Sequence, residues 1–372
     1  MESPSLIHRI FLSLWVLLLP FWDLGAGVAL VLAFFAAVLP NLSAARRRWS
    51  QSAPMWPLWG VVLMVVLGSL WHPTSLDGYL RHLPLILVFW AYDRESIARS
   101  LPVGAIAVMA FLLGAGMLRV LEGAQWDTLV YRGLLKGLHQ HVYIGTYLLL
   151  AALAVQNGPW SGRIKGFFWA LTLLFLGLLG AKMLLISALL AAGWVAFRDR
   201  SFPRWALPAV AILTLGFGLA QGLAQGRAMG HVLKPVDPHW ATGSVDTRIV
   251  QVQAAWELIQ EKPWLGWGPE STQPALNARY TQMDYRFGVK RALNVHNQWV
   301  EWALTYGLVG LGIWLVTAAA GFRVARPNPL TLGVFVLYFG SLWLTESFME
   351  RSLGVSLVAM AWMWGVVPKK EN

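Results

Sequence analysis

Apolar residues fall into long runs along most of the chain, separated by short polar or turn-forming segments. A helix that crosses the hydrocarbon core of a bilayer needs about 20 predominantly apolar residues, so these runs predict membrane-spanning helices. Several runs are shorter than that, and tilt or local thinning of the bilayer would accommodate them. The twelve runs lie at about 8–21, 24–40, 56–71, 79–92, 102–121, 139–155, 166–179, 183–197, 205–224, 297–321, 330–346 and 352–367.

The long polar segment 225–295 separates the ninth run from the tenth and is expected to contain short helices. Asp246 can cap a helix from Thr247 through Gln260, which Pro263 would end. Apolar residues recur in it at three- and four-residue steps, a pattern typical of a helix lying on the mouth of a bundle. They are Ile249, Val252, Trp256 and Ile259.

The composition agrees with a polytopic membrane protein of all-α class with about 12 transmembrane helices. Hydrophobic residues make up 57% of the 372 residues and charged residues 13%, and there are 22 Trp, which is far more apolar than a soluble domain. The net charge of +11 does not indicate nucleic-acid binding, because the basic residues sit in short clusters between apolar runs. The absence of Cys excludes a disulfide framework and a thiolate nucleophile.

The distribution of basic residues predicts the orientation in the membrane. With a cytoplasmic N-terminus, the inner loops hold 15 of the 29 Lys and Arg, the short outer loops and helix ends six, and the long segment eight. Long translocated loops are exempt from the positive-inside bias, so both termini are expected in the cytoplasm and 225–295 in the periplasm of a bacterium. Residues 1–224 would form helices one to nine, and 296–372 the last three.

The first run follows Arg9 and lacks a small-residue cleavage site. Many further runs come after it, so we expect a retained first helix and not a cleaved signal.

This orientation gathers several helix starts at the outer face. A helix N-terminus presents unpaired N–H groups and the positive end of the dipole, which favours anions, and ionisable residues at a membrane edge are functional candidates. His139 and His141 are two residues apart, so at most one is expected to face a cavity. Arg351 could instead pair with Glu346 or Glu350. The ionisable residues near these starts are Arg81, His139, His141, Lys182, His296 and Arg351.

Several motifs, in this order and at this spacing, resemble the signature region of the O-antigen ligase and polymerase superfamily, the Wzy-C-like membrane glycosyltransferases. The likeness covers about residues 177–350. Leu179-Gly180-Ala181-Lys182 stands where the family usually has a Ser-Arg pair, and Thr345-Glu346-Ser347 resembles its acidic turn between the last two helices. The central motifs are Thr247-Arg248 through Trp256, Lys262-Pro263-Trp264-Leu265-Gly266-Trp267-Gly268, Val295-His296-Asn297-Gln298-Trp299 and Tyr306-Gly307-Leu308-Val309-Gly310.

The resemblance implies a GT-C-type bundle that transfers a glycan from undecaprenyl pyrophosphate to a sugar hydroxyl, with no cofactor and no metal. His296 becomes the candidate catalytic base, with Arg248 as the second catalytic candidate. The pyrophosphate clamp would consist of Arg248, Lys182, Arg81 and Arg291. Lysine cannot form the planar two-point contact of arginine, so Arg248 is weighted above Lys182. His139, His141, Glu346 and Arg351 are further candidates.

The residue types suit this chemistry on physical grounds. Basic side chains and helix N-termini stabilise a diphosphate leaving group, and an imidazole can take the proton of a poorly nucleophilic hydroxyl. The sequence contains no D-x-D or H-E-x-x-H motif.

Three functions remain open. The first is a ligase that joins O-antigen to lipid A core, and the second is a polymerase or protein O-oligosaccharyltransferase with the same donor. The third, a transporter or flippase, predicts internal repeats and charges at the membrane midplane, neither of which is evident here.

Overall fold

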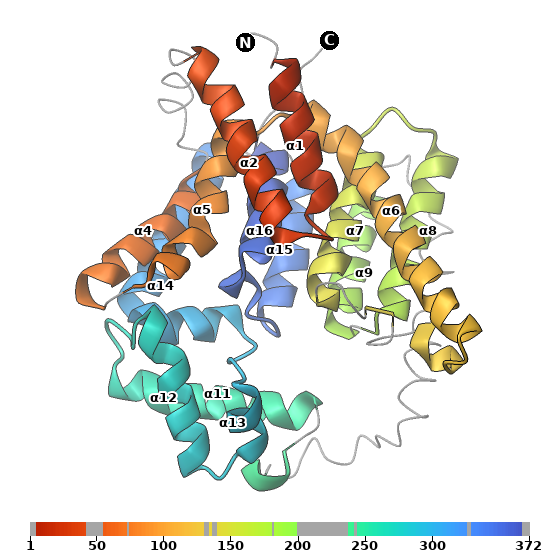
Figure 1. The fold of residues 1–372 in the computed structure, drawn as a ribbon. Helices are drawn as coiled ribbons and strands as arrows, with labels where there is room; N and C mark the ends of the chain where they lie inside the picture. Colours follow the sequence, from red (N-terminus) through yellow and green to blue (C-terminus); the bar gives the residue numbers. More distant parts are fainter. Residues whose placement is uncertain are drawn as a thin grey trace.

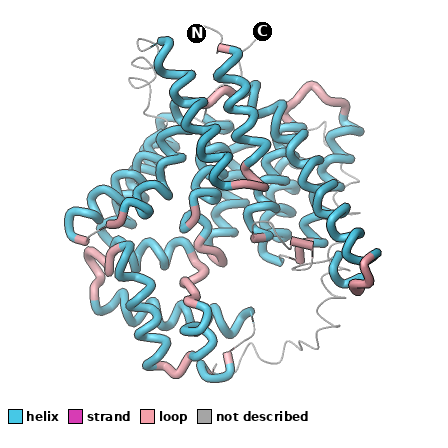
Figure 2. Tube along the Cα trace, in the orientation of Figure 1, coloured by secondary structure: helices cyan, strands magenta, loops and turns pink. Residues whose placement is uncertain are grey.

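The computed structural model describes residues 5–41, 55–72, 74–129, 134–135, 140–180, 182–198, 237–241, 244–325 and 329–366. All regular secondary structure in these ranges is helical (Figure 2). The described chain begins and ends at one end of a helical bundle, and three further helices cover the opposite end (Figure 1).

Eleven of the twelve apolar runs coincide with helices, and the run at 205–224 lies outside the described residues. The helices are α1 (Leu6–Leu18), α2 (Asp23–Val38), α4 (Trp56–Trp71), α5 (Leu76–Ala91), α6 (Arg94–Leu121), α7 (His141–Gln156), α8 (Gly162–Leu178), α9 (Lys182–Arg198), α14 (Gln298–Ala325), α15 (Pro329–Trp343) and α16 (Ser352–Val366). Among the described helices, α6 and α14 are long and apolar enough to cross a membrane. The other nine have at most 17 residues.

The outer surface of the bundle is apolar, as expected for a helical membrane protein. Exposed apolar side chains on α6, α8 and α9 include Val103, Leu118, Phe167 and Phe197, and Phe197 is 75% exposed. In water such a surface would drive aggregation, whereas lipid tails solvate it.

The interior of the bundle is formed around α7, in which every residue from Val142 to Gln156 is buried. Its buried polar groups have partners on other helices. Tyr147 donates a hydrogen bond to the Val16 carbonyl at 2.9 Å, and Trp169 donates to the Gln156 side chain at 3.2 Å. Satisfying these groups internally is required where no water is present.

The helices α11 (Ser244–Glu261), α12 (Pro269–Gln282) and α13 (Arg286–Arg291) form a cap with its own apolar core. The predicted helix in 225–295 is therefore confirmed, but it begins before Asp246, which lies in its first turn. The core-facing residues of α11 are Val250, Ala254 and Leu258, which pack with α12 and the start of α14.

The predicted apolar stripe of α11 does not pack against the bundle. Ile249, Val252 and Trp256 are exposed and face a cavity, whereas Ile259 is buried. The reason is that α12 and the start of α14 already cover the opposite face of α11, which turns the stripe towards open space.

The cap is joined to the bundle at a break inside α14. Gly307 has φ 68° and ψ −177°, a backbone region that is essentially restricted to glycine. The turn that follows α11 occupies the break: Trp267 N–H and Gly268 N–H donate to the carbonyls of Leu304 and Thr305, at 2.9 and 2.8 Å. In return, Leu308 and Val309 donate to the carbonyls of Pro263 and Trp264, at 2.8 and 3.1 Å.

These four hydrogen bonds replace the ones that α14 loses at the break. The Trp-Leu-Gly-Trp-Gly and Tyr-Gly-Leu-Val-Gly motifs are thus two halves of one junction. Glycine is required on both sides, because a Cβ at Gly266 would lie 2.6 Å from the Gly307 nitrogen, and one at Gly307 would lie 2.1 Å from the Trp264 oxygen.

We expect Gly307→Ala to lower the free energy of unfolding by about 1–3 kcal/mol for the backbone strain alone, with a further loss from the clash. The matched control is Gly312→Ala in the same helix, where a Cβ would meet nothing within 4 Å. Thermal unfolding of the purified proteins in detergent measures both. Equal stability of the two variants would contradict the proposed role of the break.

Candidate active site

A cavity of about 1670 Å³ lies between the cap and the end of the bundle. It is lined by seven of the nine residues singled out from the sequence: Arg81, His141, Arg248, Arg291, His296, Glu346 and Arg351. Lys182 begins α9, next to the cavity-lining Gly180 and Met183, but its side chain lies outside the described residues, as does the whole of His139. Side chains distant in sequence therefore meet in one place.

Glu346 connects the two principal candidates. Its Oε1 lies 3.0 Å from Nη2 of Arg248, and its Oε2 lies 3.3 Å from Nδ1 of His296. The carboxylate comes from the connection between α15 and α16, the guanidinium from α11 and the imidazole from the segment before α14. Three separate parts of the chain thus contribute to one charged group of contacts.

Asp246 is the acid nearest to Arg248 in the sequence, but the ion pair joins Arg248 to Glu346. An acid 98 residues away could not be identified as the partner from local spacing.

The electrostatics keep Glu346 ionised. Burial acts to raise its pKa, but the hydrogen bond from His296 and the nearby Arg248 guanidinium outweigh burial, so the pKa lies below its ordinary value. An ionised carboxylate only accepts hydrogen bonds, so Nδ1 of His296 must be the donor. The lone pair of the neutral imidazole then belongs to Nε2.

The backbone around His296 points its side chain away from α14. His296 has φ 53°, an uncommon value for a residue other than glycine, and it precedes the helix, which begins at Gln298 and not at the histidine. Asn297 caps the helix: its Oδ1 accepts hydrogen bonds from the N–H groups of Trp299 and Val300, at 3.0 and 3.1 Å. His296 therefore lies outside α14.

The start of α14 is clamped to the 344–349 connection. Asn297 donates to the Leu344 carbonyl at 3.0 Å, and Gln298 accepts from the Met349 N–H at 2.6 Å. Oε2 of Glu301 accepts from the Ser347 hydroxyl at 3.1 Å and from the Val295 N–H at 3.2 Å. His296 and Glu346 each lie directly beside a residue held by Glu301, so this clamp fixes their separation.

Gln298 and Glu301 were not identified as site residues from the sequence. In the structure both are nearly fully buried, at 0% and 4% exposed. The sequence did contain a signal for them, because Gln298 and Glu301 are polar residues three positions apart at the start of an apolar helix. Burying polar side chains at a membrane is costly, so such a pair indicates a functional role.

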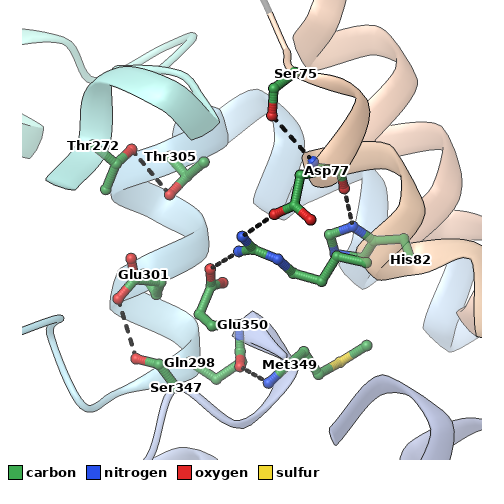
Figure 3. A network of polar contacts seen from close by, with 12 residues as sticks. Ser75, Asp77, His82, Thr272, Gln298, Glu301, Thr305, Ser347, Met349 and Glu350 are labelled. Carbon is green, nitrogen blue, oxygen red and sulfur yellow. Dashed lines mark hydrogen bonds and ion pairs between the residues drawn. The ribbon is translucent and has the colours of Figure 1, made fainter. Parts of the chain in front are cut away.

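Arg81 has acidic partners, shown in Figure 3. Its Nη1 lies 3.2 Å from Oε2 of Glu350, and its Nη2 lies 3.6 Å from Oδ2 of Asp77. Burial raises the pKa of Glu350, and the adjacent Arg81 guanidinium opposes that shift. These carboxylates would compete with a diphosphate for Arg81, as Glu346 would for Arg248.

The remaining basic candidates have different surroundings. Arg351 does not form the expected pair with Glu346 or Glu350. Glu346 contacts Arg248 and His296 instead, and Glu350 contacts Arg81. Arg351 and Arg291 are both exposed at the cavity, and the Arg291 guanidinium also stacks over the Phe287 ring, 5.0 Å from its centre. Within the described ranges, no group of three or more His, Asp or Glu residues could hold a metal ion.

The geometry can now be compared with known proteins. Residues 165–315 match the family model described as O-antigen ligase. The matched part runs from α8 into α14 and contains Lys182, Arg248, Arg291 and His296. No curated protein matches the chain. The match confirms the superfamily that the motifs indicated, without separating ligases from polymerases.

We expect Arg248 and Glu346 to be energetically coupled. Removing either one leaves the other as an uncompensated charge in a partly buried site. The losses in free energy of unfolding from Arg248→Ala and Glu346→Ala should therefore not be additive. A double-mutant cycle on the free energy of unfolding in detergent should give a coupling of about 1–3 kcal/mol.

The control cycle uses the exposed pair of Glu95 and Arg99 on α6, for which about 0.3–0.5 kcal/mol is typical. Additive losses at Arg248 and Glu346 would show that the two side chains are only neighbours.

Proposed function

Since the chain belongs to the O-antigen ligase superfamily, whose members are membrane glycosyltransferase-type enzymes, we propose that it joins an undecaprenyl-pyrophosphate-linked O-antigen glycan to a sugar hydroxyl of lipid A core. The observation that carries the proposal is the pair of contacts through which Glu346 holds His296 and Arg248 on one wall of the cavity. A base and a phosphate-binding group side by side are what this transfer needs.

In the proposed reaction, Nε2 of His296 takes the proton of the acceptor hydroxyl. The hydroxyl oxygen then forms a bond to the anomeric carbon of the donor glycan, and the bond from that carbon to the diphosphate oxygen breaks. Glu346 keeps Nδ1 protonated and stabilises the positive charge that the imidazole gains. The proton stays on His296 until product leaves, and undecaprenyl pyrophosphate carries away the negative charge.

The developing charge on the diphosphate is assigned to Arg248 and Arg291, which line the same cavity. Planar guanidinium groups bind two phosphate oxygens at once. Lys182 at the start of α9 is the proposed third contact, supported by its place beside the cavity. These side chains supply the charge stabilisation without a metal ion or cofactor, so we expect transfer to continue in the presence of EDTA.

The proposed setting is the bacterial inner membrane, with the cavity open to the periplasm and both termini in the cytoplasm. The described chain begins and ends at the end of the bundle opposite α11–α13 (Figure 1), which supports this orientation. In it, 1–224 and 296–372 are membrane parts and 225–295 is the periplasmic segment.

The test is transfer by purified protein in vitro. Undecaprenyl-pyrophosphate glycan is offered with lipid A core in one reaction and with a second lipid-linked glycan in another. Product on lipid A core supports the ligase, whereas elongation of the lipid-linked glycan alone would replace it with a polymerase. Absence of both products from folded protein would contradict the proposed reaction.

We expect His296→Ala and Arg248→Ala each to lower kcat by at least about 100-fold, as is typical for loss of a base or a charge-stabilising group. His239→Ala and Arg99→Ala are matched controls, because neither residue lines the cavity, and both should retain normal turnover. Thermal unfolding confirms that all four variants are folded. Turnover within about twofold of wild type in the first two, far short of the losses usual for such groups, would remove the site assignment.

A further inference from the structure

The cavity has two walls of opposite charge. Arg248, Arg291 and Arg351 lie on α11, on α13 and before α16, on the side that we assign to the diphosphate. The other wall is formed by α5, the start of α12, α14 and the segment before α16. Its carboxylates are Asp77, Glu270, Glu301 and Glu350, and Figure 3 shows three of them around one space between α5 and α14.

This acidic wall repels anions. Arg81 is its one described guanidinium, and Glu350 and Asp77 both contact it. Asp77 and Glu270 are both exposed and already outnumber this one guanidinium, so the wall is negative even without a charge on Glu350 or Glu301. A diphosphate placed here would be destabilised by like charge, so this wall must serve another part of the reaction.

Glu301 has one carboxylate oxygen that accepts no hydrogen bond from the described residues. The residue is 4% exposed, and both hydrogen bonds recorded for its carboxylate go to Oε2. No described residue donates to Oε1, although Glu301 lines the cavity. Oε1 is therefore available to accept a hydrogen bond from a ligand hydroxyl in the cavity.

Gln251 independently provides a second unused acceptor in the same cavity. It lies three residues after Arg248 on α11, is 1% exposed, and lines the cavity. Its side-chain Oε1 is buried with no hydrogen-bond partner. Two buried side chains on different helices therefore each have one oxygen without a donor among the described residues, and sugar hydroxyls are donors that can approach from the cavity.

The acidic wall also adjoins the proposed base. Oε2 of Glu301 is 3.2 Å from the backbone nitrogen of Val295, the residue before His296. Of the two substrates, the acceptor is the one whose hydroxyl must reach the imidazole. His296 therefore stands at the boundary between the two walls, with Arg248 beyond Glu346 on the cationic side.

From these observations we infer that the wall containing Glu301 is the acceptor subsite, and that Glu301 and Gln251 bind the hydroxyl groups of an uncharged sugar. The inference rests on the proposed glycosyl transfer. It adds that the site discriminates against acceptor sugars bearing carboxylate or phosphate next to the reacting hydroxyl, because the wall repels them.

The first test is Glu301→Gln. Glutamine keeps one oxygen to accept from Val295 and Ser347, so the clamp survives, but the cavity-facing atom becomes an N–H donor. We expect the KM for the acceptor to rise by about tenfold or more, which corresponds to the loss of one hydrogen bond, and the KM for the donor to stay within about twofold. Glu95→Gln, at an exposed pair on α6, is the matched control.

The second test, Gln251→Leu, separates binding from folding. Removing a buried acceptor that has no partner should leave the unfolding temperature unchanged or raise it, yet the acceptor KM should rise by about fivefold or more. A structural role alone predicts lower stability and an unchanged KM. A fall in stability without a change in the acceptor KM overturns the role of Gln251.

The third measurement compares kcat/KM of the wild type for two acceptors that differ only in a neutral or a uronic sugar beside the reacting hydroxyl. We expect the neutral sugar to be preferred by about tenfold or more. Equal use of both sugars, or variants that change donor KM as much as acceptor KM, overturns the acceptor subsite.

These outcomes are distinct from failure of the proposed function. Failure of the function would show as no transfer by the wild type, or as normal turnover after His296→Ala. Failure of the subsite would show in an enzyme that transfers normally and depends on His296.

Discussion

The proposed chemistry depends on the attachment of the start of α14 to the 344–349 connection. Asn297, Gln298 and Glu301 each bind that connection by a hydrogen bond, and Glu346 lies within it. The carboxylate can then reach an imidazole on one side and a guanidinium on the other.

A second constraint is the junction at Gly307. A continuous helix would satisfy its own backbone groups and would have none to offer to the cap. The break releases carbonyl and N–H groups that the 263–268 turn then pairs. The cap thereby gains a fixed position relative to α14, which is why Arg248 on α11 can be placed accurately over a residue of the bundle. The site is thus formed between two parts of the fold that are connected through backbone hydrogen bonds.

Much of the architecture was predictable because it follows from local pattern. The apolar runs specify helices wherever the chain must satisfy its backbone in a non-aqueous environment, and the runs at 56–71 and 352–367 match α4 and α16 almost to the residue. The roles expected of His296 and Arg248 came from motif order. Pairings across long sequence separations were not predictable: Arg81 meets Glu350, and Arg248 meets Glu346, only through tertiary packing. The break at Gly307 was also hidden, since the residues on both sides are helix-compatible and apolar.

The junction at Gly307 also determines how the site responds to the thickness of the bilayer. Bilayers differ in thickness, and a spanning helix responds by changing its tilt. In α14 the residues on both sides of Gly307 are bonded to the 263–268 turn, and the residues before it are also bonded to the 344–349 connection. A tilt of α14 therefore carries the cap with it through these bonds, so that the imidazole and the Arg248 guanidinium move together in membranes of different thickness.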